Sequence, residues 1–374
     1  MKNNNYTEIL SGNLPLGPYP MEKLKRVDKP TVLMTDEIAR VDERDTGLAR
    51  LLRGDLGTPA NTRSPISGSS PSIASTLMSA LYPSELRKTM TAAGNEHAGE
   101  KAEIPDNPVV MSRHMKSMGY FVGADVVGIC ELPQWAVYSH DSQGNNIELN
   151  HKYAICIVVD QGRSTMDASD GNDWISSAQS GRGYAMCGYI GDILASYIRR
   201  MGYPARLHSI RGYQVVVPPL LLLAGIGEMS RANIVLNPFL GLRYKASVVT
   251  TDLPLQPDKP VDFGLQNFCD KCMKCSTECP SRSISSGDKI LKNGYENWEF
   301  DAVTCTRYRF QNPKGVLCGR CIKVCPWNKP EGWTHDLVRW MVEHTPALNG
   351  FFVKMDDICG NGKADIRKKW WFDP

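Results

Sequence analysis

The segment CDKCMKCSTECP, residues 269–280, places four cysteines at spacings of two, two and three residues, with a proline directly after the fourth. A second set follows, so that eight of the twelve cysteines of this 374-residue chain lie between positions 269 and 325. In a chain that is not exported, closely spaced cysteines are more often metal ligands than disulfide partners, because neighbouring thiolates on a short loop can converge on one centre. This stretch therefore predicts a metal-binding domain.

The spacing also narrows the choice of metal. The run C-x2-C-x2-C-x3-C-P is typical of bacterial ferredoxins, in which three thiolates hold one [4Fe–4S] cluster and the fourth reaches a second cluster. Structural zinc sites and a disulfide framework are the alternatives, and the matching second set of cysteines argues against both. If each set gives its fourth cysteine to the cluster of the other set, one cluster is bound by Cys269, Cys272, Cys275 and Cys325. The other cluster is then bound by Cys279, Cys305, Cys318 and Cys321. We interpret Cys130, Cys156, Cys187 and Cys359 as ordinary thiols.

Charge and hydropathy give little indication of partners. The net charge is +3, with no block of like charges that would predict a nucleic-acid tail or a polybasic membrane patch. The longest apolar run, VVVPPLLLLAGIG at 215–227, contains two prolines and is shorter than the ~20 residues of a spanning helix. No charged segment followed by an apolar one opens the sequence, so we expect a cytoplasmic protein, or one on the outer face of the cytoplasmic membrane if an export signal was removed.

The length predicts a main domain and a smaller one. Residues 54–76 are rich in Gly, Pro and Ser and predict a surface loop, NHKYAICIVVD predicts a buried strand, and GRGYAMCGYIGDILASYIRRMGYPAR predicts an amphipathic helix. The three prolines of LPLQPDKPVDF, 253–263, favour an extended connector. We therefore predict an α+β protein with an N-terminal arm and loop region (1–106), an α/β core (107–252), a ferredoxin-like two-cluster domain (253–330) and an extension closing on the core (331–374).

Several blocks closely resemble the corrinoid-dependent reductive dehalogenases: GYPARLH, YQVVVPP, VTTDLPLQPDKPVDFGLQNFC, both cysteine sets, CPWNK and the late KWWF. Weaker similarity, including RVDERDT at 40–46, extends over most of the chain. The resemblance implies a nitroreductase-like core that binds cobalamin base-off, without a histidine on cobalt, and close to one cluster. It places Tyr213 and Gln214 at the corrinoid.

The resemblance also implies the reaction R–X + 2e⁻ + H⁺ → R–H + X⁻ on a small organohalide, with cob(I)alamin as the nucleophile. It makes Tyr184 the proton donor, in the first turn of the helix that begins GRGYAMCGY, where the positive helix terminus favours an anion. Arg243, in NPFLGLRYKA, corresponds to the cation that stabilises the phenolate. Tyr189 and Arg182 are the rival residues for these two roles.

The substrate pocket is less defined. Many family members carry asparagine where this chain has Gly212, so the pocket floor is expected to be wider or to differ in polarity. Candidate wall residues are Trp135, Tyr138, Tyr308 and Phe310.

Rival functions and the partners stay open at this point. An epoxyqueuosine reductase shares the corrinoid core and two-cluster tail, but would need a tRNA-binding surface and an RDYH-like block, and RDY does not occur here. A corrinoid reductase without halide chemistry and a plain ferredoxin-type electron carrier are two further rivals. We expect an electron-donor protein or a quinol-linked reductant, with a small membrane anchor protein as a further partner, and no nucleic acid.

Overall fold

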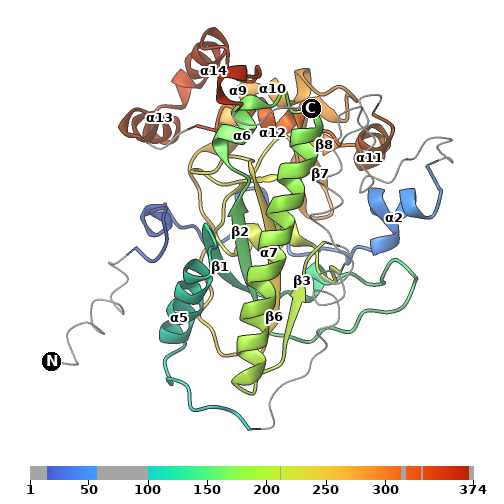
Figure 1. Cartoon of the computed structure of the whole chain (residues 1–374), viewed down its shortest axis with the longest axis vertical. Coiled ribbons are helices and arrows are strands. Elements are labelled where there is room, and N and C mark those ends of the chain that lie inside the picture. The colour runs from blue at the N-terminus through green and yellow to red at the C-terminus, as the bar shows by residue number, and fades with distance from the viewer. Residues whose placement is uncertain (1–14, 57–99, 211, 313–316, 330–331, 370–374) are drawn as a thin grey trace.

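The computed structural model describes residues 15–56, 100–210, 212–312, 317–329 and 332–369 (Figure 1). The surface loop predicted for 54–76 falls almost entirely outside these residues. None of the helices in the described ranges has the length and apolar character of a membrane span.

A four-stranded sheet forms the centre of the core, in the order β1-β2-β6-β3. The strand predicted from NHKYAICIVVD is β2, where Ile155 pairs with Ile129 on one side and with Val249 on the other. All three strand pairs are antiparallel, so the core is not a parallel α/β unit, and the predicted α+β class is confirmed. The strands are β1 (Val126–Glu131), β2 (Tyr153–Asp160), β3 (Ala205–His208) and β6 (Tyr244–Thr251).

Both faces of this sheet are buried, which is why β2 has an unbroken apolar sequence. Ile155 and Ile157 pack into one hydrophobic core with α5 and α7, whereas Ala154 and Cys156 point into a second core with α8. In Figure 1 the long helix α7 runs across the front of the sheet, with α5 beside it. The main helices are α5 (Pro108–Phe121), α7 (Trp174–Arg200) and α8 (Val217–Leu223), and the smaller elements are η4 (Gln134–Ala136), α6 (Arg163–Ala168), β4 (Glu228–Met229) and β5 (Val235–Leu236).

Helix α7 begins at Trp174, well before the predicted start. The Asp173 carboxylate caps it by accepting the Ser176 N–H at 3.2 Å. The glycine-rich stretch that looked like a helix start lies inside the helix. It contains Gly183, where a Cβ would lie only 2.8 Å from Cγ of Lys245 on β6. The glycine allows helix and sheet to approach closely. Tyr184 is therefore in the third turn, and the predicted contribution of the helix N-terminus is wrong.

The second domain follows an extended connector, as predicted for 253–263. Its first helix, α9, is fixed to the core by Glu228, whose carboxylate accepts the N–H groups of Phe263 (2.8 Å) and Leu265 (3.3 Å). Burial raises the pKa of this carboxyl. The domain comprises α9 (Leu265–Cys272), α10 (Lys274–Thr277), the hairpin β7 (Ile284–Lys292) and β8 (Tyr295–Phe300), α11 (Ala302–Gln311) and α12 (Arg320–Lys323).

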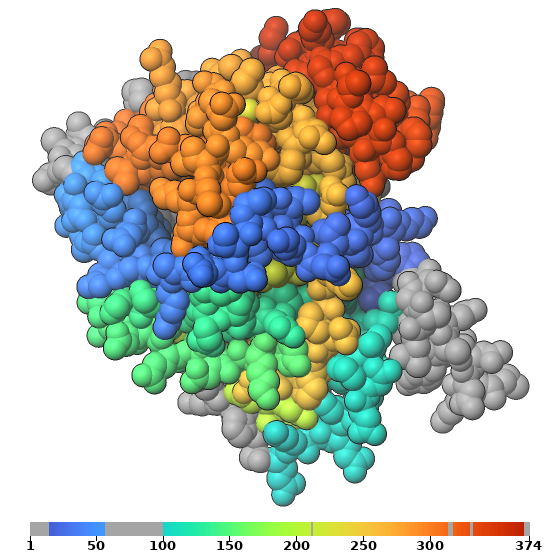
Figure 2. Space-filling view, turned by 180° about the vertical axis from the view of Figure 1, so that it is seen from behind, coloured from blue at the N-terminus to red at the C-terminus, as the bar shows by residue number. Residues whose placement is uncertain are grey.

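The N-terminal arm, residues 15–56, contacts both domains. In Figure 2 it runs as a blue band between the core and the second domain. Its Arg26 pairs with Val261 of the connector, and its Leu33 pairs with Tyr295 of β8. Its last helix packs on α11, where a Cβ on Gly47 would lie 2.3 Å from the Thr306 hydroxyl oxygen. The arm contains η1 (Met21–Lys23), η2 (Glu43–Asp45) and α2 (Gly47–Leu52).

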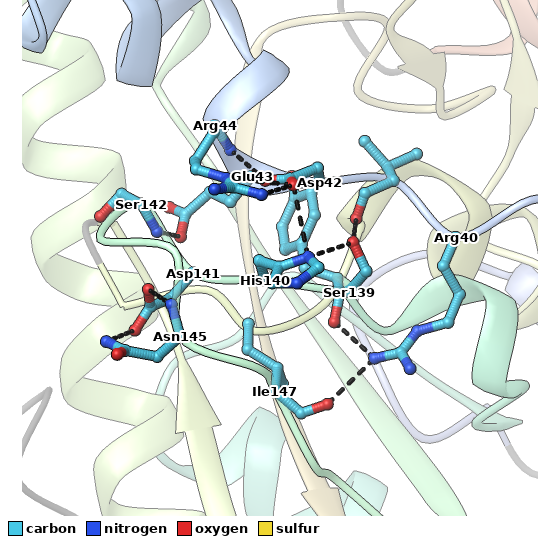
Figure 3. A network of polar contacts seen from close by, with 12 residues as sticks. Arg40, Asp42, Glu43, Arg44, Ser139, His140, Asp141, Ser142, Asn145 and Ile147 are labelled. Carbon is cyan, nitrogen blue, oxygen red and sulfur yellow. Dashed lines mark hydrogen bonds and ion pairs between the residues drawn. The ribbon is translucent and has the colours of Figure 1, made fainter.

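The RVDERDT block fixes this arm to the core (Figure 3). Arg40 donates to three carbonyl oxygens, those of Val137 (3.1 Å), Tyr138 (2.6 Å) and Ile147 (3.0 Å). Glu43 accepts the N–H of Ser142 at 2.8 Å. Resemblance in this block therefore reflects, in this chain, how the arm docks.

The C-terminal extension packs mainly on α9 of the second domain, and reaches the core where η6 contacts α6. The buried Asp356 accepts Lys274 Nζ at 2.5 Å and also pairs with Lys329. Both helices of the extension leave apolar side chains in solvent: Trp333, Leu337 and Trp340 on α13, and Phe351, Met355 and Ile358 on α14. The elements are α13 (Trp333–His344), η5 (Pro346–Leu348), α14 (Asn349–Ile358) and η6 (Ile366–Lys368).

Candidate active site and cysteine groups

The first group of cysteines surrounds one small space. Cys269 and Cys272 come from α9, Cys275 from α10, and Cys325 follows α12. All four line the same cavity, together with Arg231, Phe268 and Trp327. The structure thus brings together the set predicted from the exchanged fourth cysteine, although Cys325 lies far from the other three in sequence.

The second group lies at the junction of α11, α12 and the end of the first cysteine run. Burial, and then the nearby thiols of Cys318, Cys305 and Cys279, raise the pKa of the Cys321 thiol to about 12. Cys279 therefore lies with the second set, as predicted. No three His, Cys, Asp or Glu side chains within the described ranges are spaced to hold a single metal ion.

This second group, Cys279, Cys305, Cys318 and Cys321, is the one that adjoins helix α7. The Leu317 N–H donates to the Ser177 hydroxyl at 3.0 Å, and the Gly319 N–H donates to the Gly171 carbonyl at 2.7 Å. Ser177 precedes Tyr184 by seven residues, or ~10 Å along a helix. Helix α7 therefore contacts the segment that carries these cysteines, and it also carries Tyr184.

Tyr184 lies beside a cation, but that cation is Lys245. Lys245 Nζ is 5.1 Å from the centroid of the Tyr184 ring. Both side chains are half-buried, whereas the rival Tyr189 is 53% exposed and Arg182 is exposed. Lys245 is the second residue of β6, and Gly183 allows α7 to approach it. Sequence reasoning missed this residue.

Arg243 has a different environment. It is 4% exposed, and its Nε donates to both Asp160 carboxylate oxygens, at 3.1 and 3.3 Å. Its Nη1 donates to the Lys329 carbonyl at 3.4 Å, which connects the core to the second domain. These contacts indicate a structural ion pair, and they give no support to the predicted action of Arg243 on Tyr184.

The loop before α8 contains both residues expected at the corrinoid. The Tyr213 hydroxyl donates to the Ala246 carbonyl at 3.2 Å, on the strand that carries Lys245. The Gln214 N–H donates to His208 Nδ1 at 3.1 Å, and the Gln214 carbonyl accepts the Tyr138 N–H at 2.9 Å. The loop is thus tied to β6 and β3.

A buried chain of hydrogen bonds supports this loop. Because His208 Nδ1 accepts from Gln214, its Nε2 donates to the Thr250 hydroxyl at 2.9 Å, and that hydroxyl donates to His151 Nδ1 at 2.8 Å. Burial lowers the pKa of both imidazoles, so both are neutral. These two histidines are therefore structural. His140 instead contacts Asp42 of the arm at 3.3 Å.

The predicted wall residues are distributed over the molecule. Trp135 packs edge-on against Tyr295 of β8, with ring centroids 6.3 Å apart. Tyr138 is largely buried, and this raises its pKa to about 12. The Tyr308 hydroxyl accepts a hydrogen bond from Asn172 at 3.2 Å, next to the second cysteine group. Gly212 and Phe310 are half-buried, so their role as pocket residues stays a prediction.

Comparison with known proteins agrees with the cysteine-containing second domain and with the core. The family model of the 4Fe–4S dicluster domain matches residues 268–329. The solved structure of the catabolic reductive dehalogenase NpRdhA with 3-bromo-4-hydroxybenzoic acid superposes with a TM-score of 0.87 at 39% identity, covering 98% of this chain. The chain is a homologue of the reductive dehalogenases. A second such structure, described as suggesting a mechanism for B12-dependent dehalogenation, gives a TM-score of 0.88 at 40% identity over 96% of this chain and 52% of the other.

Sequence relatives carry the same name. The tetrachloroethene reductive dehalogenase of Sulfurospirillum multivorans is 36% identical over 47% of this chain and 36% of its own length. That of Dehalobacter restrictus is 31% identical over 65% of this chain and 44% of its own length. The chain thus spans less than half of these relatives and 53% of the NpRdhA chain.

Proposed function

We propose that this chain replaces halogen by hydrogen on a small organohalide, R–X + 2e⁻ + H⁺ → R–H + X⁻, as a corrinoid- and iron–sulfur-dependent oxidoreductase. The observation that carries the proposal is the half-buried Tyr184 with the Lys245 ammonium 5.1 Å from its ring, on a helix that also meets the second cysteine group. A proton donor, a cation beside it and a route for electrons are what the reaction requires of the protein.

The eight cysteines fit two [4Fe–4S] clusters. The four thiols of the first group line one cavity and those of the second lie close together, and iron would stabilise the thiolate form that burial disfavours in the iron-free chain. Because the second group adjoins α7, we assign its cluster as the one nearer the reacting centre, and the Cys269 group as the outer cluster.

Ser209 and the residues 212–214 fit a corrinoid bound without a histidine ligand. The buried Ser209 hydroxyl has no hydrogen-bond partner in the part of the chain that the structure describes, so a polar group is available there to a ligand. His208 is engaged through both ring nitrogens. When bound, the corrinoid supplies the low-valent cobalt that cleaves the carbon–halogen bond.

This chain's own groups handle the proton. Tyr184 donates its phenolic proton to the reacting carbon, which forms the new C–H bond. Lys245 stabilises the resulting phenolate. Tyr213 and Gln214, which are fixed to Ala246 and His208, would form the floor of the site and hold the corrinoid when it is bound.

Electrons would enter near the outer cluster. A cavity of about 270 Å³ lies between α13, α14 and the second domain, and it shares Phe268, Pro326 and Trp327 with the space inside the Cys269 group. The exposed apolar side chains of α13 and α14 lie on the helices that form this cavity. An electron-donor protein would bind to that surface, with a quinol-linked reductant or a membrane anchor protein as alternatives.

The compartment is part of the proposal. Free thiols that ligate iron require reducing conditions, which supports a cytoplasmic location, with the outer face of the cytoplasmic membrane under anaerobic conditions as the alternative.

Anaerobic turnover tests the function. The chain would be reconstituted with iron, sulfide and cobalamin, and halide release would be measured with chlorinated and brominated alkenes and phenols. Tyr184→Phe should retain both cofactors and lose ~10²-fold or more of the rate, since it removes only the transferable proton. Tyr189→Phe, on the same helix but 53% exposed, should keep the parent rate. Absence of halide release from a fully loaded parent chain would contradict the proposal.

A further inference from the structure

Arg231 is a buried cation at the first cysteine group. It lies in the turn between β4 and β5 and is 2% exposed. Among the residues that the structure describes, its guanidinium donates only to backbone carbonyls: those of Cys269 (3.1 Å), Ser285 (3.0 Å), Gly287 (3.2 Å) and Asp270 (3.5 Å). The hydrogen bonds of this side chain are therefore satisfied, but its charge is not compensated by any of these acceptors.

The surroundings add positive charge to this site. Arg231 lies over the ring of the buried Trp298, with its Cζ 4.4 Å from the ring centroid, and Lys289 Nζ lies 4.7 Å from the same centroid. The buried carboxylate of Glu228 accepts from Phe263, Leu265 and Thr31 instead. Within the described ranges, no carboxylate forms an ion pair with Arg231. A buried charge without a counter-ion is costly, so this geometry calls for an anion.

The cavity of the first cysteine group provides a place for that anion. Arg231 lines it together with Cys269, Cys272, Cys275 and Cys325. A [4Fe–4S] cluster on four thiolates is negatively charged in both oxidation states, and becomes more negative when reduced. Net charge and hydrogen bonding near the sulfurs are among the factors that set its reduction potential.

We propose that Arg231 is the counter-ion of the cluster held by the Cys269 group and that its charge raises the reduction potential of this cluster. Stabilisation is greater for the reduced form, because that form carries one more negative charge. The cluster in turn compensates the buried guanidinium. Arg231 is thus a positioning and tuning residue of the outer cluster. The proposal depends on the cysteine grouping and not on dehalogenation, since a reduction potential is measured without substrate.

The second group has an arginine of its own, which provides a matched control. Arg309 lies one turn after Cys305 on α11, and its Nε is buried without a hydrogen-bond partner in the described ranges. Each arginine should therefore act on one cluster only.

Redox titration followed by electron paramagnetic resonance tests the proposal on the reconstituted chain. Cys272→Ser and Cys305→Ser assign the two cluster signals. Arg231→Gln should shift the midpoint potential of the Cys269-group cluster to a more negative value and leave that of the other cluster unchanged. Arg231→Lys should reverse most of this shift. Arg309→Gln should move only the second cluster. Parent midpoints in Arg231→Gln, or a shift confined to the second cluster, would overturn the proposal.

A variant that loses the cluster is also decisive. Without iron, Arg231 is an uncompensated buried charge, so iron-free Arg231→Gln should melt at the same temperature as the iron-free parent or higher. If Arg231→Gln fails to hold the cluster but its iron-free form melts at the parent temperature or higher, the cluster requires the arginine as its counter-ion. A lower melting temperature would mean that Arg231 serves only to join backbone carbonyls, and the proposal would be wrong.

Discussion

Replacing Lys245 by glutamine should slow dehalogenation without unfolding the core. Its Nζ lies 5.1 Å from the Tyr184 ring. If this distance to the ring centroid stands for the distance to the phenolate charge, the attraction at an effective dielectric constant of about 20 is about 3 kcal/mol. Because about 1.4 kcal/mol corresponds to a factor of ten in rate, Lys245→Gln should lower kcat/KM for halide release by about two orders of magnitude.

A double-mutant cycle with Tyr184→Phe tests the reasoning. Lys245 acts through the tyrosine, so the double variant should be no slower than Tyr184→Phe alone. Arg243→Gln is the contrasting variant: it leaves Asp160 unpaired and should cost about 3 kcal/mol of unfolding free energy, measured in urea. Parent activity in Lys245→Gln, or losses that add in full with Tyr184→Phe, would refute the assignment of Lys245.

Three further predictions concern the clusters, the histidines and the contact of α7 with the sheet. The loaded chain should contain about eight irons, and Cys279→Ala should perturb the cluster of the second group, whereas loss of only the Cys269 cluster would refute the grouping. Burial lowers the pKa of His208, so as the pH falls the unfolded chain takes up a proton before the folded chain does. The free energy of unfolding should therefore fall by up to about 1.4 kcal/mol per pH unit below pH 6.5. His208→Gln should flatten this dependence in urea titrations. Gly183→Ala places a Cβ 2.8 Å from Lys245 Cγ and should cost about 1–3 kcal/mol in urea unfolding while slowing halide release; an unchanged rate would show that the position of Lys245 is not critical.

The cysteine grouping and the strand β2 could be predicted because the determining signals are local. Thiolates that share a cluster require short spacings, and a strand buried on both faces requires an unbroken apolar run. The end of α7 also has a local signal, because Gly202, whose φ is +82°, and Pro204 follow its last residue, Arg200.

Other features depend on contacts between distant segments. The glycines of α7 look like a helix start until the sheet they approach is known. The choice between Arg243 and Lys245 could not be made from spacing, because Arg243 precedes β6 and Lys245 lies within it. Arg231 gave no signal at all, since its environment is formed by carbonyls and a tryptophan ring from separate segments of the chain.

The interleaving of the two cysteine groups along the chain bears on biosynthesis. Cys325 completes the group that begins at Cys269, and Cys279 belongs with cysteines that follow it from Cys305 onward. Neither set of four is therefore complete until the ribosome has passed the last cysteines of the domain. Cluster insertion must follow translation of the whole domain, and a transcript truncated before codon 325 would yield a chain unable to mature its first cluster.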